Sequence, residues 1–219
     1  MSARQKDLLK AVEYPESDGQ PMAETDKHRQ LMINIIESLK THFAAEPDVY
    51  VSGNLMCYYE ENNPKASISP DVFVVRGAAK HERRIYKFWE EPAPQVVLEI
   101  SSRKTRKEDF GKKKELYAWL GVREYFVFDP DAKLRAPLRV FRLHRTDLVE
   151  EMVTGNRIIS HELGLDLENT GETLRLFDPR TQAFLLTPAE SYARAEEEAA
   201  RANRLAAKLR ELGLDPDQL

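Results

Sequence analysis

Hydrophobic and polar positions form a strand pattern at several places along the central part of the chain. Four segments are rich in β-branched and aromatic residues and are predicted to be buried strands: 48–60, 68–75, 94–102 and 123–130. Between the last two lies a basic stretch with helical spacing, residues 103–122. The order strand, helix, strand predicts a right-handed crossover in a mixed sheet.

The flanking regions add one helix and several short strands. Thr25 or Asp26 is a suitable N-cap for a helix that runs to about His42, with apolar residues at helical spacing. Gly53 predicts a bulge in the first strand. Residues 61–65 form a hairpin-like turn, and short strands are expected at 139–145, 152–159 and in the LGLDL and TLRLFD pieces that follow. These elements complete an α/β domain.

Residues 76–93 are charged and predict an exposed excursion, in which Tyr86, Phe88 and Trp89 are expected to pack down as an anchor. A partner or substrate surface is the alternative for the same three aromatic residues.

The composition changes at Pro188, after which alanine, glutamate and arginine dominate. A long helix is predicted there, with Gly213 as its C-terminal stop. It carries a narrow apolar seam of Tyr192, Ala195, Ala199, Ala202, Ala206 and Leu209. A seam this thin is marginal alone, so the helix packs on its own domain or on a second copy, unless it is a frayed tail. We therefore expect a domain at 1–187 and a helical extension at 188–219, with a homo-oligomer, preferably a dimer.

Composition places the chain among ordinary globular proteins. It has 219 residues, 42% of them hydrophobic, and a formal net charge of −4. The negative net charge argues against a protein that binds nucleic acid over most of its surface, but it allows a local basic groove. No apolar run is long enough to span a membrane, no apolar signal core follows the first residues, and the single cysteine, Cys57, is expected in the core. We expect a cytoplasmic protein.

Two carboxylates interrupt the apolar pattern of the predicted strands. Asp71 falls on the same side of its strand as Phe73 and Val75, and Glu99 on the same side as Val97. A buried carboxylate needs a cation, a donor or a proton. Each acid taken alone is best explained by an Arg or Lys partner or by a turn cap. Two acids brought together from neighbouring strands favour Mg²⁺ or Mn²⁺.

The helix after the second acid places a further acid and a lysine on its packing face. A turn of about 100° per residue gathers an apolar stripe of Phe110, Leu116, Tyr117 and Leu120. Asp109 and Lys113 fall within that stripe. They either pair with each other, or Lys113 reaches the metal site, holds an attacking water and offsets phosphate charge.

Four basic residues precede this helix: Arg103, Lys104, Arg106 and Lys107. They suit phosphate contacts of a nucleic acid, although a basic run is more often a solvated face. Other chemistries are not indicated, because the sequence has no GxxxxGK[ST], GxSxG or HExxH motif and no plausible structural zinc set.

These residues also resemble the Uma-two family of restriction-endonuclease-like proteins, in the PD-(D/E)XK nuclease superfamily. The resemblance spans roughly residues 14–188. Its matching pieces are Tyr14-Pro15, Asp18-Gly19, His28, Ser52-Gly53-Asn54, Pro70-Asp71, Val97 to Ile100, Ser102, Thr105, Asp109, Lys113, Tyr117, Gly121-Val122, Glu124-Tyr125 and Asp129-Pro130. It implies a restriction-endonuclease-like mixed β-sheet flanked by helices.

The resemblance also implies roles for the site residues. Asp71 and Glu99 would bind a divalent metal, Mg²⁺ or Mn²⁺. The superfamily places a lysine two residues after the glutamate, where this chain has Ser101, and the resemblance implies that Lys113 takes its place. His28, Asp109, Ser101 and Tyr117 are expected as supporting residues. His28 read from the sequence alone is better explained as a surface or cap residue.

Three functions follow as hypotheses. The first is a metal-dependent endonuclease that hydrolyses nucleic-acid phosphodiesters, with DNA as the expected substrate. The second is a non-catalytic, oligomeric interaction or regulatory protein on a nuclease-like fold, favoured by Ser101 and by the negative charge. The third is a hydrolase of other phosphoesters or small molecules that uses the same metal set.

Overall fold

A computed structural model describes residues 12–17, 19, 25–131, 136–171, 173–212 and 215. Gly213, the predicted helix stop, and Asp18, part of the family resemblance, lie outside the described residues. The chain divides into two compact units, one ending at Leu185 and one beginning at Leu186.

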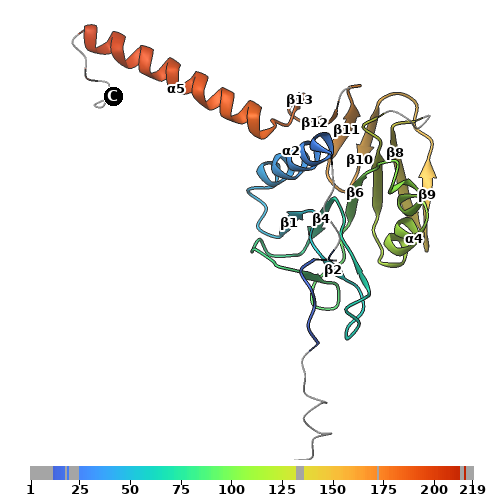
Figure 1. The fold of residues 1–219 in the computed structure, drawn as a ribbon. Coiled ribbons are helices and arrows are strands. Elements are labelled where there is room, and N and C mark those ends of the chain that lie inside the picture. The colour runs from blue at the N-terminus through green and yellow to red at the C-terminus, as the bar shows by residue number, and fades with distance from the viewer. Residues whose placement is uncertain are drawn as a thin grey trace, which may run out of the picture. The chain divides into compact units, whose positions relative to one another are not determined.

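A six-stranded mixed sheet forms the centre of the first unit (Figure 1), in the order β1-β4-β6-β7-β8-β9. Its strands are β1 (Val49–Ser52), β4 (Val72–Arg76), β6 (Val96–Ile100), β7 (Glu124–Phe128), β8 (Leu138–His144) and β9 (Asp147–Glu151). Strands β6 and β7 are parallel, as the predicted crossover requires, and the other neighbours are antiparallel. In the described part of the chain, β1 and β9 are the two edges.

Two small sheets accompany the central one. The first has the order β3-β2-β5, and the second has the order β10-β11-β12-β13. Their strands are β2 (Cys57–Tyr58), β3 (Ser67–Ile68), β5 (Tyr86–Lys87), β10 (Arg157–Ser160), β11 (Leu165–Asn169), β12 (Leu174–Asp178) and β13 (Ala183–Phe184). The single strand predicted at 48–60 is therefore wrong. The chain leaves the central sheet after Ser52, and β2 pairs elsewhere.

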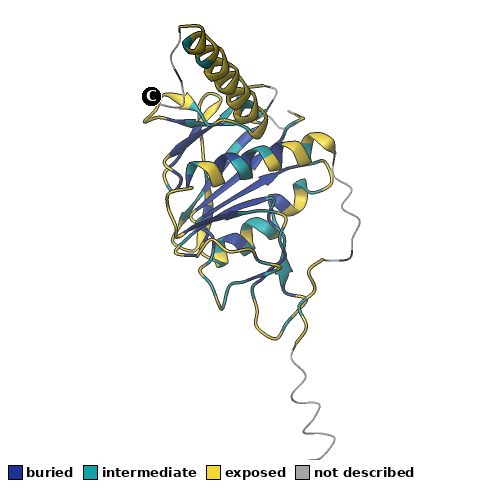
Figure 2. Ribbon diagram, turned by 90° about the vertical axis from the view of Figure 1, so that its left-hand side faces the viewer, coloured by how far each residue is buried: buried dark blue, intermediate teal, exposed yellow. Residues whose placement is uncertain are grey.

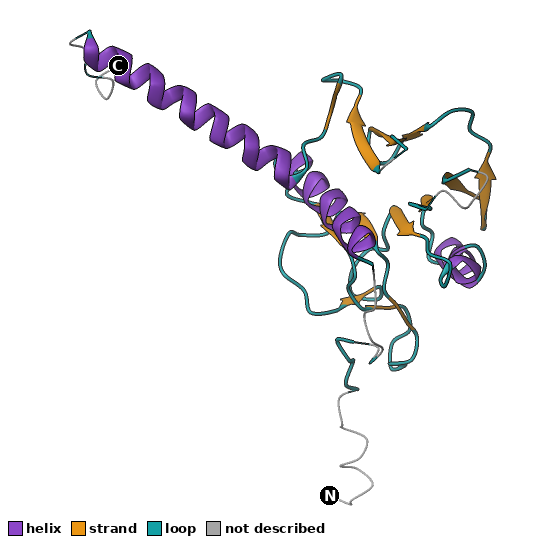
Figure 3. Cartoon of the chain, turned by 45° about the horizontal axis from the view of Figure 1, so that its top comes forward, coloured by secondary structure: helices purple, strands orange, loops and turns teal. Residues whose placement is uncertain are grey.

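The central sheet is covered on both faces, so it has two apolar cores. On one face, α2 (Asp26–His42) and strands β10 to β12 pack against alternate residues of the central strands, such as Val72 and Leu98. On the other face, α4 (Lys112–Trp119) supplies the fully buried Tyr117 to a core that includes Phe73 and Val97. Figure 2 shows the buried strands between the two helices, and Figure 3 shows helices and strands in separate colours.

The predicted helix over 103–122 is broken into two pieces, which corrects the sequence interpretation. It forms α3 (Arg106–Asp109) and α4, and Gly111 stands between them with φ −116° and ψ −106°, outside the helical region. A Cβ atom at Gly111 would lie 2.8 Å from the Lys107 carbonyl oxygen, so the break needs glycine. The apolar stripe predicted for this helix still faces the core, because Tyr117 is buried and Phe110 packs against the same core.

Capping residues begin both α2 and the C-terminal helix, and the cap of α2 is one of the two predicted residues. Thr25 caps α2, and its hydroxyl accepts a hydrogen bond from the His28 backbone N–H at 3.2 Å. The second unit contains α5 (Pro188–Glu211), which begins with a capping box formed by Thr187 and Glu190. No described residue of α5 is buried, and Tyr192 is 67% exposed.

In the 76–93 segment, Tyr86 is fully buried, and its hydroxyl donates a hydrogen bond to the Pro92 carbonyl at 2.7 Å. The expectation that this aromatic residue packs down rather than forms a surface is confirmed. Phe88 packs against the same core and is partly buried.

Candidate active site

The first acid, Asp71, lies immediately before β4, where a glycine lets another segment come close. The Gly53 position is so tight that a Cβ there would lie 1.9 Å from the Asp71 carbonyl oxygen. Beside it, the Asn54 backbone N–H donates to the Pro70 carbonyl at 2.8 Å. Gly53 therefore allows the Ser52–Asn54 segment to hold the Pro70-Asp71 turn in place.

The Asp71 side chain joins three elements at one point. Its Oδ2 accepts a hydrogen bond from the Ile100 backbone N–H at 2.7 Å, at the end of β6. Its Oδ1 lies 3.4 Å from Nε2 of His28, in the first turn of α2. No arginine or lysine among the described residues forms an ion pair with Asp71, so the simple salt-bridge explanation of this acid does not apply. His28 lies at the site, as the resemblance implies.

The second acid, Glu99, lies on β6 next to Ile100 and is 1% exposed. Its Oε2 lies 2.9 Å from Nζ of Lys113, and its Oε1 accepts a hydrogen bond from the Tyr117 hydroxyl at 2.6 Å. Burial raises the pKa of Glu99 to about 8. The positive charge of Lys113 opposes this rise, and the nearby carboxylate of Asp71 adds to it.

Lys113 extends from α4 to both buried acids on this side of the sheet. Its Nζ lies 2.9 Å from Glu99 and 3.3 Å from Oδ1 of Asp109, which is 1% exposed. Burial alone would lower the pKa of Lys113, but the surrounding carboxylates outweigh it and raise the pKa. The Asp109 backbone carbonyl accepts a hydrogen bond from the Tyr125 hydroxyl at 3.0 Å, which ties α3 to β7.

The charges of this cluster are unbalanced. Three carboxylates, from Asp71, Glu99 and Asp109, face one lysine whose ammonium reaches two of them. Two buried oxygen atoms, Oδ2 of Asp109 and Oγ of Ser101, have no hydrogen-bond partner among the residues that the structure describes. Such a cluster attracts a further cation.

The donor set fits a hard divalent ion that keeps much of its water. Among the described residues, no group of three or more His, Cys, Asp or Glu side chains is arranged to hold a metal by itself. Mg²⁺ does not need such a cage, because it is usually held by one or two carboxylates together with water and substrate phosphate. Asp71 and Glu99, with the Ile100 carbonyl, are of this kind.

The four basic residues that were predicted to contact phosphate have different surroundings in the structure. Arg103, Lys104 and Lys107 are exposed, as residues that contact phosphates would be. The Arg106 guanidinium instead lies 3.0 Å from Oδ2 of Asp129, which is buried at the end of β7. Arg106 thus joins α3 to the sheet, and its contact with phosphate stays a prediction.

Sequence reasoning missed the part that Gly53 plays. We interpreted it as a bulge, whereas it holds the backbone of Asp71 in position. Its signal was a glycine inside a strand-like run, which also indicates close approach of another backbone.

The mixed sheet with its flanking helices, and the acids at its strand ends, define a restriction-endonuclease-like α/β protein, the class predicted from the sequence. The chain belongs to the Uma2 family, described as "Putative restriction endonuclease", whose model matches residues 6–174. Proteins of this restriction-endonuclease-like class generally use divalent metals.

The chain shows a partial likeness to one solved structure, a putative nuclease belonging to DUF820 from Anabaena variabilis ATCC 29413. The two share 16% sequence identity and a TM-score of 0.49, over 69% of this chain and 86% of that one. No curated protein matches the sequence. Within the described residues, none of the helices combines the length and the apolar character that crossing a membrane requires.

Proposed function

We propose that this protein is a metal-dependent endonuclease that hydrolyses phosphodiester bonds of DNA. One observation carries the proposal. Asp71 and Glu99 meet at the ends of neighbouring strands, and the lysine that pairs with Glu99 comes from the following helix. This gives a buried, net negative site with one fixed ammonium group, which suits a cation and a phosphate bound together.

The metal would be Mg²⁺ or Mn²⁺, held by the Asp71 and Glu99 carboxylates and the Ile100 backbone carbonyl. When bound, it would polarise the scissile phosphate and stabilise the negative charge that develops on it. The raised pKa of Glu99 supports this assignment, because a divalent cation favours the ionised form that burial disfavours.

Lys113 would hold the attacking water and offset charge on the phosphate. Its ammonium donates only, so it can accept no proton while charged. Asp109 would keep the ammonium in place from 3.3 Å, and Tyr117 would fix the orientation of the Glu99 carboxylate. Lys113 would thereby supply the positive charge that Ser101, at the usual lysine position, lacks.

His28 would hold the other acid. Its Nε2 faces Oδ1 of Asp71 while Oδ2 is bound by the Ile100 N–H, so the carboxylate plane is restrained from two sides. We assign His28 a positioning role and Arg103, Lys104 and Lys107 contacts with the nucleic-acid backbone.

The experiment is cleavage of plasmid and linear DNA by pure protein, with Mg²⁺, with Mn²⁺ and with EDTA. Asp71→Asn and Glu99→Gln keep the shapes of the acids and are expected to abolish cleavage. Lys113→Met is expected to lower it by at least tenfold. Lys112→Met, an exposed lysine on the same helix, is the matched control and should cut normally. Undiminished cutting by both acid variants would refute the assignment, and cleavage of mononucleotide esters alone would indicate a small-molecule hydrolase.

A homodimer formed through α5 is proposed alongside this activity. The seam residues of α5 follow one another at alternating spacings of three and four residues. Two large apolar side chains of this helix are exposed, Tyr192 of the seam at 67% and Leu205 beside it at 55%. Residues 188–200 contain four glutamates and one arginine, whereas residues 201–211 contain four basic residues and one glutamate. Two antiparallel copies would therefore place opposite charges beside each other.

Sedimentation tests the dimer with Ala199→Glu, which introduces a charge at the middle of the seam. The variant should be monomeric where the parent is dimeric, and Arg201→Gln should not dissociate the dimer. A variant that remains dimeric would exclude α5 as the pairing element. If the parent dimerises but neither binds metal nor cuts, the non-catalytic interaction protein is the better account, since Ser101 leaves the usual lysine position without charge.

A further inference from the structure

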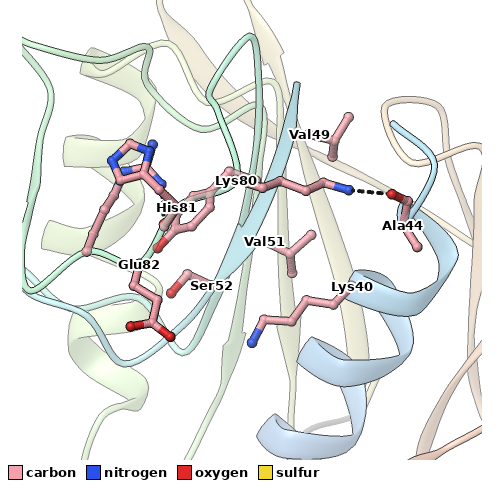
Figure 4. A pocket seen from close by; sticks show the side chains of 10 residues that line it. Lys40, Ala44, Val49, Val51, Ser52, Lys80, His81 and Glu82 are labelled. Carbon is pink, nitrogen blue, oxygen red and sulfur yellow. Dashed lines mark hydrogen bonds between the residues drawn. The ribbon is translucent and has the colours of Figure 1, made fainter. Parts of the chain in front are cut away.

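A cavity of about 590 Å³ lies beside the open edge of the central sheet, apart from the acid cluster. Its floor is strand β1, and its walls are the last turn of α2 with the residues that follow, and the loop 80–83 (Figure 4). Its volume is within the usual range for ligand sites.

One residue of β1, Val51, faces this cavity with backbone groups that pair with no other strand in the described part of the chain. The Gly77 N–H donates to the Asp48 carbonyl at 2.8 Å, so Asp48 bonds toward β4. Bonding direction alternates along an antiparallel strand, which makes Val51 point its N–H and C=O away from β4. In the described part of the chain, no strand pairs with β1 on that side, and Val51 lines the cavity.

Basic side chains dominate the cavity walls in a chain of net charge −4. Lys40, Lys80, His81 and Arg83 line it, against one lining acid, Glu82, and the Arg83 guanidinium is paired with Glu91. The Lys80 ammonium is held in place because it donates to the Ala44 carbonyl at 3.2 Å, at the C-terminal end of α2. It remains a positive charge, since both its described partners are neutral carbonyls.

Lys40 is the cation most available to a ligand. Among the described residues it forms an ion pair with Glu37 alone, one turn away, and both side chains are about half exposed, at 49% and 47%. Such exposed pairs contribute little, so Lys40 can exchange its partner for a stronger anion. In Figure 4 its ammonium extends toward the Ser52 end of the cavity.

Helix α2 and strand β1 connect this cavity with the acid cluster. Helix α2 places His28 against Asp71 in its first turn and Lys40 in the cavity near its last. Their separation of twelve positions corresponds to about 18 Å of helix. Strand β1 leads from the cavity through Ser52 to Gly53, whose Cα abuts the Asp71 carbonyl. About 18 Å is roughly five nucleotides along one strand of B-form DNA.

We propose that this cavity binds the sugar–phosphate backbone of the nucleic-acid strand that occupies the acid cluster, a few nucleotides from the bond to be cut. This rests on the proposed function, and it adds a second contact region. Lysine ammonium, hydroxyl and backbone N–H groups are the usual donors to phosphate and sugar. Lys40, Lys80, Ser52 and the Val51 N–H supply them here.

The test measures binding of a labelled 25-base-pair DNA by fluorescence anisotropy in EDTA, at several salt concentrations. Each phosphate contact contributes about 0.9 to the slope of log affinity against log salt. Lys40→Gln should lower this slope by roughly that amount and weaken binding severalfold, while Lys40→Arg should restore both. Lys65→Gln, an exposed lysine on the β2–β3 turn, is the matched control and should change neither.

The outcome separates this inference from the activity itself. If the parent binds through Lys40 but never cuts, the cavity assignment stands and the nuclease does not. If Lys40→Gln and Lys40→Glu both bind DNA with the parental slope, the inference is wrong, even when the parent cuts well. A Lys40-dependent affinity for an extended acidic peptide, without any effect on DNA, would also overturn it and indicate strand addition to β1.

Discussion

Removal of the Lys113 charge is the perturbation with the clearest physical consequence. In Lys113→Met the Glu99 and Asp109 carboxylates, each 1% exposed, lose the ammonium that lies 2.9 Å and 3.3 Å from them. Methionine keeps most of the length and apolar stem of the side chain. The variant therefore isolates the charge from the packing.

The expected loss of stability is large, because one partner of a buried ion pair is removed while the other remains. Such changes destabilise proteins by about 3–5 kcal/mol. For a chain of this size that corresponds to a fall in melting temperature of roughly 6–20 °C. Urea unfolding followed by circular dichroism, in EDTA, measures the difference in unfolding free energy.

The loss should depend on pH with a definite sign. Lys113 opposes the rise in the pKa of Glu99, so its removal raises that pKa further above the unfolded value of 4.5. A carboxyl whose pKa is raised by folding loses stability as pH rises. The deficit should therefore be smallest below about pH 7, where the parent Glu99 is still largely protonated, and should grow as pH rises past about 8, where that carboxyl ionises beside Lys113. Lys112→Met should show no deficit. A Lys113→Met deficit that does not increase between about pH 7 and pH 9 would refute the buried-cluster account.

Three further outcomes follow from the same contacts. In EDTA the unfolding free energy should fall by up to about 1.4 kcal/mol per pH unit between 4.5 and about 8, and Glu99→Gln should abolish that fall in a urea titration. Gly53→Ala should destabilise by about 1–3 kcal/mol and reduce cleavage, because its Cβ would meet the Asp71 carbonyl; parental melting and activity would contradict this. Tyr117→Phe should lose about 1–2 kcal/mol at pH 8, and no loss would mean that its bond to Glu99 is unimportant.

Periodicity predicted the elements whose signals are local. The N-cap Thr25, the strand–helix–strand order and the apolar stripe around Tyr117 are all present, because capping geometry and side-chain alternation depend on nearby residues. The pairing of Lys113 with an acid on its own helix segment was foreseen for the same reason, as one of two alternatives. The contact with Asp109 is present, and Lys113 also contacts Glu99, while its role at a metal site stays a prediction.

Features set by contacts between distant segments were not predictable in this way. Gly53 was predicted to form a bulge, because no residue near it in the sequence indicates that the Asp71 backbone lies against it. The break at Gly111 lies inside a strong helical pattern, and the ion pair of Arg106 with Asp129 joins residues that are 23 positions apart. The cavity beside β1 is likewise formed by three separate segments.

The central claim is that Asp71 and Glu99 share one divalent cation beside Lys113. Anomalous diffraction from crystals soaked in millimolar Mn²⁺ tests it most directly. The account predicts an anomalous peak within coordination distance of both carboxylates, and its loss in Asp71→Asn crystals treated in the same way. Crystals that show no peak between the two acids, from protein that cleaves DNA in the same Mn²⁺ solution, would contradict the claim.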